Sequence, residues 1–190
     1  MGNNTVTFGL KNVHYSKAML KDDGTWEFAK PVALLGAQEF TSDLIGSSQS
    51  VYADDQVVAT LNQNAGRTIT LKVTDIPDEF KVDILGYRKL GNGNLVEITN
   101  APVETFALGL EFQGDVKARR VWFYLCTTSP INEGTKSKTD SVEANGVSLT
   151  ITARPINLTG NLYTTHIISS KGDENYDTFL TEAPTIPEVI

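Results

Sequence analysis

The stretch FALGLEFQGDVKARRVWFYLC, residues 106–126, decides the fold. Its first part, FALGLEF, alternates large apolar residues with small or polar ones, which predicts a half-buried strand. Its last part, VWFYLC, is apolar at every position and predicts a strand that is covered on both sides. A turn at Gln113-Gly114-Asp115 joins the two strands. We therefore expect this hairpin to lie at the centre of a β-rich domain.

The alternation assigns a face to each side chain of this hairpin. In the first strand one face holds the larger apolar residues, and in the second strand both faces are apolar. The expected faces are Phe106, Leu108, Leu110 and Phe112 opposite Ala107, Gly109 and Glu111, and then Val121, Phe123 and Leu125 opposite Trp122, Tyr124 and Cys126.

Composition indicates a foldable soluble chain. Its 190 residues fit one domain, 40% of them are hydrophobic and 21% are charged. No apolar run is long enough to span a membrane, and the N-terminus lacks the pattern of a signal peptide. A single cysteine, Cys126, excludes an internal disulfide. The net charge of −7 argues against a protein that grips nucleic acid by its phosphates.

Further strands are predicted around the central hairpin. Residues 13–20 form one, and Asp23-Gly24 is a turn from which residues 26–35 return, interrupted by Pro31. A clean alternation over residues 147–154 predicts an amphipathic strand that ends at Pro155. These elements favour a β-sandwich or barrel.

A long polar segment, residues 46–56 (GSSQSVYADDQ), is expected to be a loop. Residues 57–62 and 68–74 are then predicted to pair as a hairpin through Asn64-Ala65-Gly66. The loop is the strongest candidate for a functional segment, because it is long for a plain hairpin connection.

One short helix is expected in IPDEFKVDILG, residues 76–86. Pro77 suits the first turn, Asp78 and Glu79 lie near the positive end of the helix dipole, and Gly86 suits the end. Its apolar residues Phe80, Ile84 and Leu85 predict packing against a sheet.

The C-terminal residues 156–190 are polar, with scattered apolar residues and two prolines. We expect an extended arm or tail there, beside a β-sandwich domain over residues 1–155. A neighbouring subunit is the expected means of ordering that arm.

The sequence holds no recognisable catalytic or metal-binding constellation. Neither His14 nor His166 has a ligand or acid at metal-site spacing, and Cys126 lies in an apolar strand that would raise its pKa. The acidic pairs Asp22-Asp23 and Asp54-Asp55 lack calcium-loop spacing and suit turns. We therefore expect no enzyme activity, no metal and no cofactor.

The order of these features resembles the major tail protein, or tail tube protein, of long non-contractile-tailed bacteriophages, in the variant common among phages and prophages of Gram-positive bacteria. The resemblance covers about residues 8–155. Its segments are GLKNVHYSK, DDGTWEF, QEF with VYADD, IPDEFKVDILG, FALGLEFQGD with RRVWFYLC, and VSLTITARP. The helix segment and the FALGLEF–RRVWFYLC pair are the most specific.

The resemblance implies a β-sandwich of the phage tail-tube type with a flanking helix. It implies rings of six subunits that stack into a tube, assembled in the host cytoplasm and then part of the virion tail. The genome passes through the channel, which is typically negatively charged, without specific binding. Tape measure and other tail proteins are the implied partners. The stacking loop maps to residues 46–56, with Gly46, Ser50, Tyr52, Asp54 and Asp55 as candidate contacts and Tyr52 as an anchor.

Two alternatives stay open at this point. One is a related ring or tube subunit of another injection machine, or a tail terminator that caps the tube. The other is a carbohydrate-binding β-sandwich, which would need an exposed aromatic platform built around Trp26 or Trp122.

Overall fold

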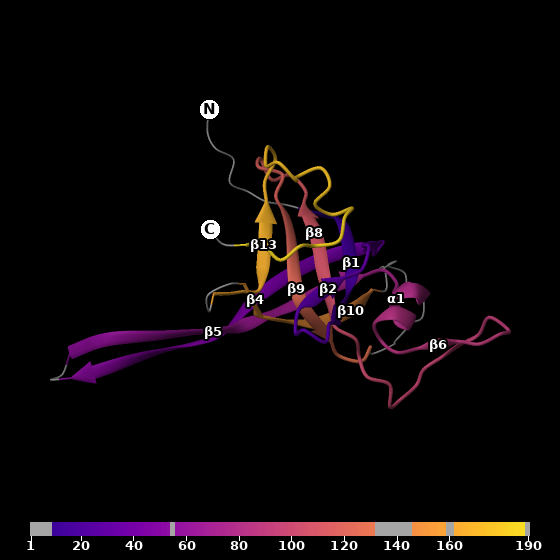
Figure 1. Ribbon diagram of the computed structural model, residues 1–190, viewed down its shortest axis with the longest axis horizontal. Helices are drawn as coiled ribbons and strands as arrows, with labels where there is room; N and C mark the ends of the chain where they lie inside the picture. Colours follow the sequence, from indigo (N-terminus) through magenta and orange to yellow (C-terminus); the bar gives the residue numbers. More distant parts are fainter. Residues whose placement is uncertain (1–8, 54–55, 132–145, 159–161, 189–190) are drawn as a thin grey trace, which may run out of the picture.

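The computed structural model describes residues 9–53, 56–131, 146–158 and 162–188; within strands, the side chains of residues 47–53 and 57–63 are not described. Half of the chain is strand, and the described part holds a single short helix, α1 (Asp78–Asp83) (Figure 1). The mainly β fold with one short helix is the one that the sequence predicted.

Nine strands form one antiparallel sheet in the order β2-β1-β8-β9-β10-β5-β4, with β13 paired to β9 and β3 paired to β1. Their bounds are β1 Leu10–Leu20, β2 Trp26–Phe28, β3 Val32–Ala33, β4 Ala37–Ala53, β5 Gln56–Val73, β8 Phe106–Phe112, β9 Arg120–Thr128, β10 Val147–Arg154 and β13 His166–Ser169. Two small hairpins complete the fold: β6 (Arg88–Lys89) with β7 (Leu95–Val96), and β11 (Ile156–Asn157) with β12 (Tyr163–Thr164).

The sheet folds over on itself into two layers around the main core. The ring of Phe40 on β4 lies 6.2 Å from that of Phe112 on β8 and 5.7 Å from that of Phe123 on β9. Strands β4, β5 and β10 therefore pack across β1, β8 and β9. The helix closes the core, because Phe80 makes edge-to-face contacts with Tyr15 and Phe106 at 5.0 and 5.6 Å.

The central hairpin is more buried than its alternation predicted. Every residue from Phe106 to Glu111 is buried, so the expected half-buried strand is wrong. The second face of β8, which includes Ala107, lies in a second core with Trp122 and Tyr124. That face is covered by the C-terminal part of the chain, which no local pattern in β8 could reveal.

A β-bulge in β9 exchanges the faces of two residues. Phe106 pairs with Cys126 but Leu108 pairs with Phe123, so β9 holds one more residue than β8 over this stretch. As a result Cys126 joins the main core and Leu125 joins the second core, the reverse of the expected assignment.

The segment predicted as a loop is instead strand. β4 runs through residues 46–53 and pairs with β5, so the expected hairpin between residues 57–62 and 68–74 is wrong. The Asn64-Ala65-Gly66 signal marks an irregularity inside β5, where Ile45 pairs with Gly66 and Gly46 with Asn64. Gly66 has φ 138°, and an added Cβ would lie 2.5 Å from the carbonyl oxygen of Ala153. Gly66 therefore lets β5 lie close to β10, and the chain does not reverse direction at this tripeptide.

Candidate assembly surfaces

A two-stranded ribbon projects from the body. It consists of residues 46–53 of β4 and 56–64 of β5, and in Figure 1 it extends far beyond the layered sheet. β10 pairs with β5 only over residues 67–73, so the ribbon begins where that support ends. Among the described residues, neither outer edge of the ribbon has a strand partner. An isolated two-stranded hairpin is marginally stable in water, and an open edge invites pairing with another chain.

Three of the five residues predicted as contacts of the stacking loop lie in this ribbon. Gly46 is exposed at its root, and Ser50 and Tyr52 lie within β4, where their backbones pair with Thr60 and Val57. Asp54 and Asp55 lie outside the described residues. The ribbon therefore replaces the loop as the candidate contact element. Its strands contain residues 46–53 and 56 of the predicted loop.

Arg67 lies on β5 at the root of the ribbon. Its Nη1 donates to Ser42 Oγ at 3.4 Å, while its Nε is buried and is the one buried side-chain polar atom in the described part without a hydrogen bond. Burial and the charge of Arg67 lower the pKa of His166. His166 is half-buried, and its ring lies 5.4 Å from the ring of Phe123 at an interplanar angle of 32°.

The helix packs through the three residues that the sequence named. Phe80 and Ile84 are fully buried and Leu85 is nearly so, all in the main core. The helix itself is shorter than expected, because Ile84 is its C-cap and Leu85 follows it. Tyr15 Oη donates to Asp83 Oδ2 at 3.0 Å and ties the helix to β1.

The C-terminal segment lies on the sheet instead of forming the expected extended arm. β13 pairs with β9, and residues 170–188, here named the C-terminal strap, cover the second core. Alternate side chains of β9 donate to strap carbonyls: Arg120 to Tyr176 and Asp177, Trp122 Nε1 to Phe179 at 2.5 Å, and Tyr124 Oη to Thr185 at 2.8 Å. Side chains of the sheet thus supply hydrogen-bond donors to the backbone carbonyls of the strap.

Gly109 on β8 makes room for the Trp122 side chain beneath the strap. An added Cβ at Gly109, its partner on β8, would lie 2.7 to 2.8 Å from three carbons of the indole ring. The sequence indicated that both faces of β9 are covered, since VWFYLC is apolar on both faces. What covers it was not predictable, because Leu180 and Pro184 are scattered among polar residues of the strap.

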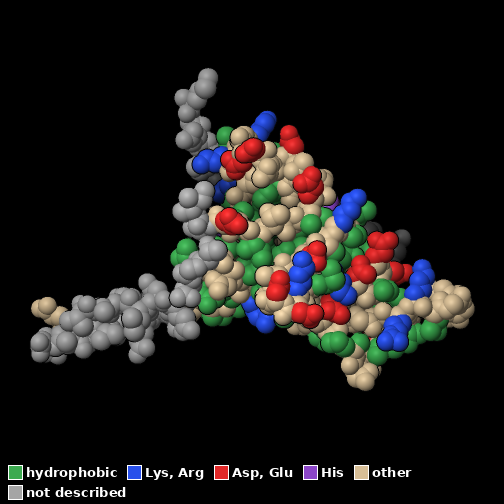
Figure 2. Space-filling view, viewed as in Figure 1, with side chains coloured by type: hydrophobic (Ala, Val, Ile, Leu, Met, Phe, Trp, Pro, Cys, Tyr) green, Lys and Arg blue, Asp and Glu red, His purple; other side chains and the backbone are tan. Residues whose placement is uncertain are grey.

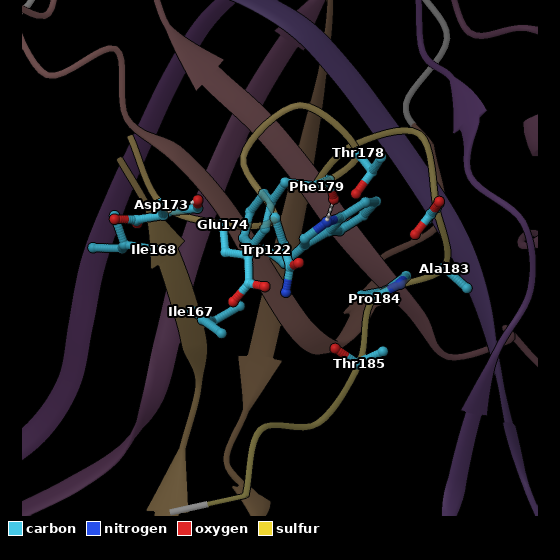
Figure 3. Close-up of a pocket in the computed structure, with 13 residues that line it drawn as sticks. Trp122, Ile167, Ile168, Asp173, Glu174, Thr178, Phe179, Ala183, Pro184 and Thr185 are labelled. Carbon is cyan, nitrogen blue, oxygen red and sulfur yellow. Dashed lines mark hydrogen bonds between the residues drawn. The ribbon is translucent and has the colours of Figure 1, made fainter. Parts of the chain in front are cut away.

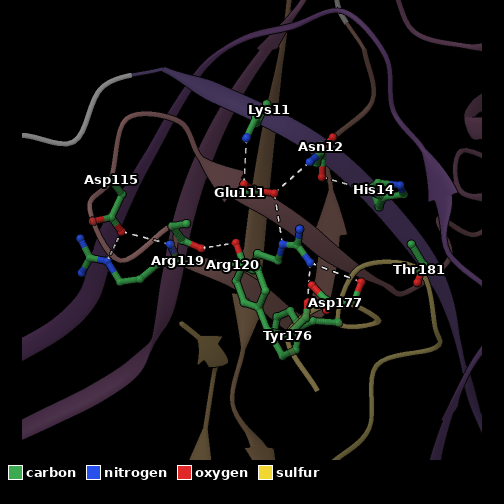
Figure 4. Close-up of polar contacts among 12 residues, drawn as sticks. Lys11, Asn12, His14, Glu111, Asp115, Arg119, Arg120, Tyr176, Asp177 and Thr181 are labelled. Atoms are coloured by element: carbon green, nitrogen blue, oxygen red, sulfur yellow. Dashed lines mark hydrogen bonds and ion pairs between the residues drawn. The ribbon is translucent and has the colours of Figure 1, made fainter. Parts of the chain in front are cut away.

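A buried carboxylate links the strap to the N-terminal strand (Figure 4). Glu111 accepts hydrogen bonds from Asn12 Nδ2 at 2.8 Å and Arg120 Nε at 3.1 Å, and Lys11 Nζ lies 3.0 Å from it. Burial alone would raise the pKa of Glu111, but these hydrogen bonds and the two cations outweigh it and hold the pKa below its usual value. Arg120 also lies 4.0 Å from the centre of the Tyr176 ring. The strap is thereby joined to a charge network that sequence reasoning missed.

A shallow pocket of about 340 Å³ lies between the strap and β13 (Figure 3). Trp122 and Ile167 form part of its floor, and Asp173, Glu174 and Glu182 lie around it. Trp122 is 1% exposed and Trp26 is partly buried, so neither forms the exposed platform that a carbohydrate-binding sandwich would use.

The described residues hold no group of three or more His, Cys, Asp or Glu side chains that could bind a metal. Burial raises the pKa of the Cys126 thiol, and Nδ1 of His14 forms a hydrogen bond with the Asn12 carbonyl oxygen.

No helix in the described part has the length and apolar character needed to cross a membrane. On the face shown in Figure 2, acidic and basic side chains are interspersed.

Comparison with known proteins assigns no family: no protein-family model matches the chain, and no curated protein matches it either.

Proposed function

We propose that this chain is a non-enzymatic structural subunit that polymerises into a tube, in the manner of a phage major tail protein. The observation that carries the proposal is the ribbon. It leaves the body as two paired strands, and both of its outer edges are unpaired among the described residues. Such an element is stabilised by contact with another chain.

The free edge of β4 also suits a ring. Within the described residues β4 pairs with β5 alone, so its backbone groups are open to a strand of a neighbouring subunit. Head-to-tail contacts of this kind close into rings when the rotation between subunits permits. By resemblance, six subunits form a ring, and the ribbons join each ring to the next.

The acidic balance of the chain supports a role as a conduit. A net charge of −7 disfavours tight binding to phosphates, which suits a tube through which DNA passes without specific contact. In this proposal the protein belongs to the virion tail. Its partners are copies of itself, the tape measure protein and other tail proteins.

A shortened ribbon tests the proposal. Gly46 and Asn64 are cross-strand partners, so residues 47–63 can be replaced by a two-residue Asn-Gly turn without disturbing the register below them. We expect the variant to fold, with an unchanged circular dichroism spectrum, and to form no tubes in negative-stain electron microscopy of the purified protein.

The control inserts Asn-Gly into the exposed turn at residues 91–94, between β6 and β7. This control is expected to leave tube length unchanged. Normal tubes from the shortened-ribbon variant would show that the ribbon is not the stacking element. A wild-type protein that stays monomeric at high concentration would contradict the proposed function as a whole.

A related ring protein, such as a tail terminator, is the second candidate, since the ribbon and the free β4 edge suit it equally. The two differ in their products. A tube protein forms long helical arrays by itself, whereas a terminator forms single rings.

A further inference from the structure

The two layers of the sheet differ in what lies on their outer faces. The outer face of β8 and β9 lies in the second core and is covered by the C-terminal strap. The outer face of β4, β5 and β10 is polar, and no described segment covers it. We call this second surface the hydroxyl face; its members are Glu39, Thr41 and Asp43 of β4, Thr68, Thr70 and Lys72 of β5, and Ser148, Thr150, Thr152 and Arg154 of β10.

The hydroxyl face is ordered by the strand register. Thr150 pairs with Thr70, and Thr70 pairs with Thr41, which places three threonines in a row across the layer. The next rows are Thr152–Thr68–Asp43 and Ser148–Lys72–Glu39. On β5 and β10 these residues alternate with buried ones such as Ile69, Leu71 and Ile151, so the core sets the outward direction of the face.

The charges of this face cancel. Glu39 and Asp43 supply two negative charges, Lys72 and Arg154 supply two positive charges, and the other six members are uncharged hydroxyl residues. No apolar side chain lies in these three rows; Ile45, the next residue of β4 on this face, pairs with Gly66 beyond them. A neutral surface of this kind holds water through its hydroxyls, and these rows offer a polyanion neither the clustered cations that bind phosphate nor an apolar patch.

We propose that the hydroxyl face is the wall of the tube's channel, past which a hydrated polyanion such as DNA slides. This inference rests on the proposed function. It also specifies how the wall avoids adhesion: by charge neutrality and hydration of these three strands, rather than by the negative charge that the resemblance implies. The acidic excess of the chain then lies elsewhere on the subunit, and the strap lies on the side away from the channel.

Cysteine labelling of assembled protein tests the location of the face. The native thiol, Cys126, is fully buried, so a thiol introduced by Thr70→Cys is the accessible one. In free subunits it should react with both N-ethylmaleimide and a large poly(ethylene glycol) maleimide. In tubes we expect reaction with the small reagent and loss of the gel shift that the large reagent produces, because only small molecules enter a narrow channel.

Thr181→Cys, on the exposed side of the strap, is the matched control and should react with both reagents in tubes. A Thr70→Cys thiol that reacts with the large reagent in tubes places the face outside, and one that is closed to both reagents places it in a subunit interface. Either result overturns the inference while leaving tube formation intact. If Thr70→Cys does not assemble, Thr150→Cys reports on the same row.

A positive charge added to the neutral wall supplies the second readout. Tubes of Thr70→Lys should retain a short DNA oligonucleotide in a nuclease-protected, salt-sensitive form. Thr181→Lys tubes should retain only DNA that nuclease digests. Absence of protected DNA in Thr70→Lys tubes contradicts the channel assignment, whereas absence of tubes from the wild-type protein contradicts the proposed function itself.

Discussion

The ribbon and the C-terminal strap behave oppositely. The ribbon is held by backbone pairing of β4 with β5 and leaves the body, whereas the strap has almost no regular pairing and is held by side chains of the sheet. Strand pairing alone can carry a segment into solvent. An irregular segment stays in place only where side chains bury it and satisfy its carbonyls. Substitutions in the strap should therefore alter stability, and substitutions in the ribbon should alter assembly.

The largest effect on stability is expected for Trp122→Ala. The indole is 1% exposed and joins the second core to the strap through its hydrogen bond to Phe179. Its loss should lower the free energy of unfolding by about 3–5 kcal/mol, as for other buried aromatic truncations. Chemical denaturation measures this loss. Trp26→Ala, on the partly exposed β2, is the control and should lose less; equal losses would contradict the role assigned to the strap.

Glu111→Gln should have the next largest effect. It leaves Arg120 near a neutral partner, and we expect a loss of about 2 kcal/mol because Lys11 and Arg120 retain some access to solvent. The pKa of Glu111 is depressed in the folded state, so its contribution is present above the unfolded pKa of about 4.3 and is lost as pH falls through the lower folded value. Unfolding curves at a series of pH values should show a shallower acid loss for Glu111→Gln than for the wild type. If the stability of the two proteins fell in parallel with decreasing pH, Glu111 would be excluded as the source of the acid-dependent loss.

A smaller change is expected for Tyr124→Phe, which removes the hydrogen bond to Thr185 and keeps the ring. The net loss should be about 1 kcal/mol. Hydrogen–deuterium exchange should rise in residues 180–188 and stay unchanged in α1. Uniform exchange across the chain would show that the strap opens only with global unfolding.

The smallest effect on stability is expected in the ribbon. Tyr52 lies in the ribbon, beyond the part of β5 that pairs with β10, so Tyr52→Ala should change the free energy of unfolding by less than about 0.5 kcal/mol. Tube formation should nevertheless be reduced, as measured by sedimentation of assembled protein. A variant that is destabilised yet assembles normally would reverse the comparison between ribbon and strap.

Local pattern predicted the elements whose partners are near in sequence or whose burial repeats regularly. The strand over residues 147–154, the turn at Asp23-Gly24 and the apolar residues of α1 fall in this class. The β4 half of the ribbon was mistaken for a loop because residues 46–56 are polar and rich in turn formers, whereas residues 57–62 were predicted as strand. The candidate site was therefore placed on the right segment, with the wrong local structure.

By itself the sequence determined a mainly β chain with one short helix, a doubly apolar strand at its centre and an acidic balance, because alternation, capping and charge are read from neighbouring residues. Only the tertiary structure decided the bulge that exchanges Leu125 and Cys126, the partners of Glu111, the docking of the strap, and that no described segment covers the hydroxyl face. Each depends on contacts between residues far apart in the chain, such as Arg120 with Tyr176 or Trp122 with Phe179. Their energies arise only when folding brings those groups together.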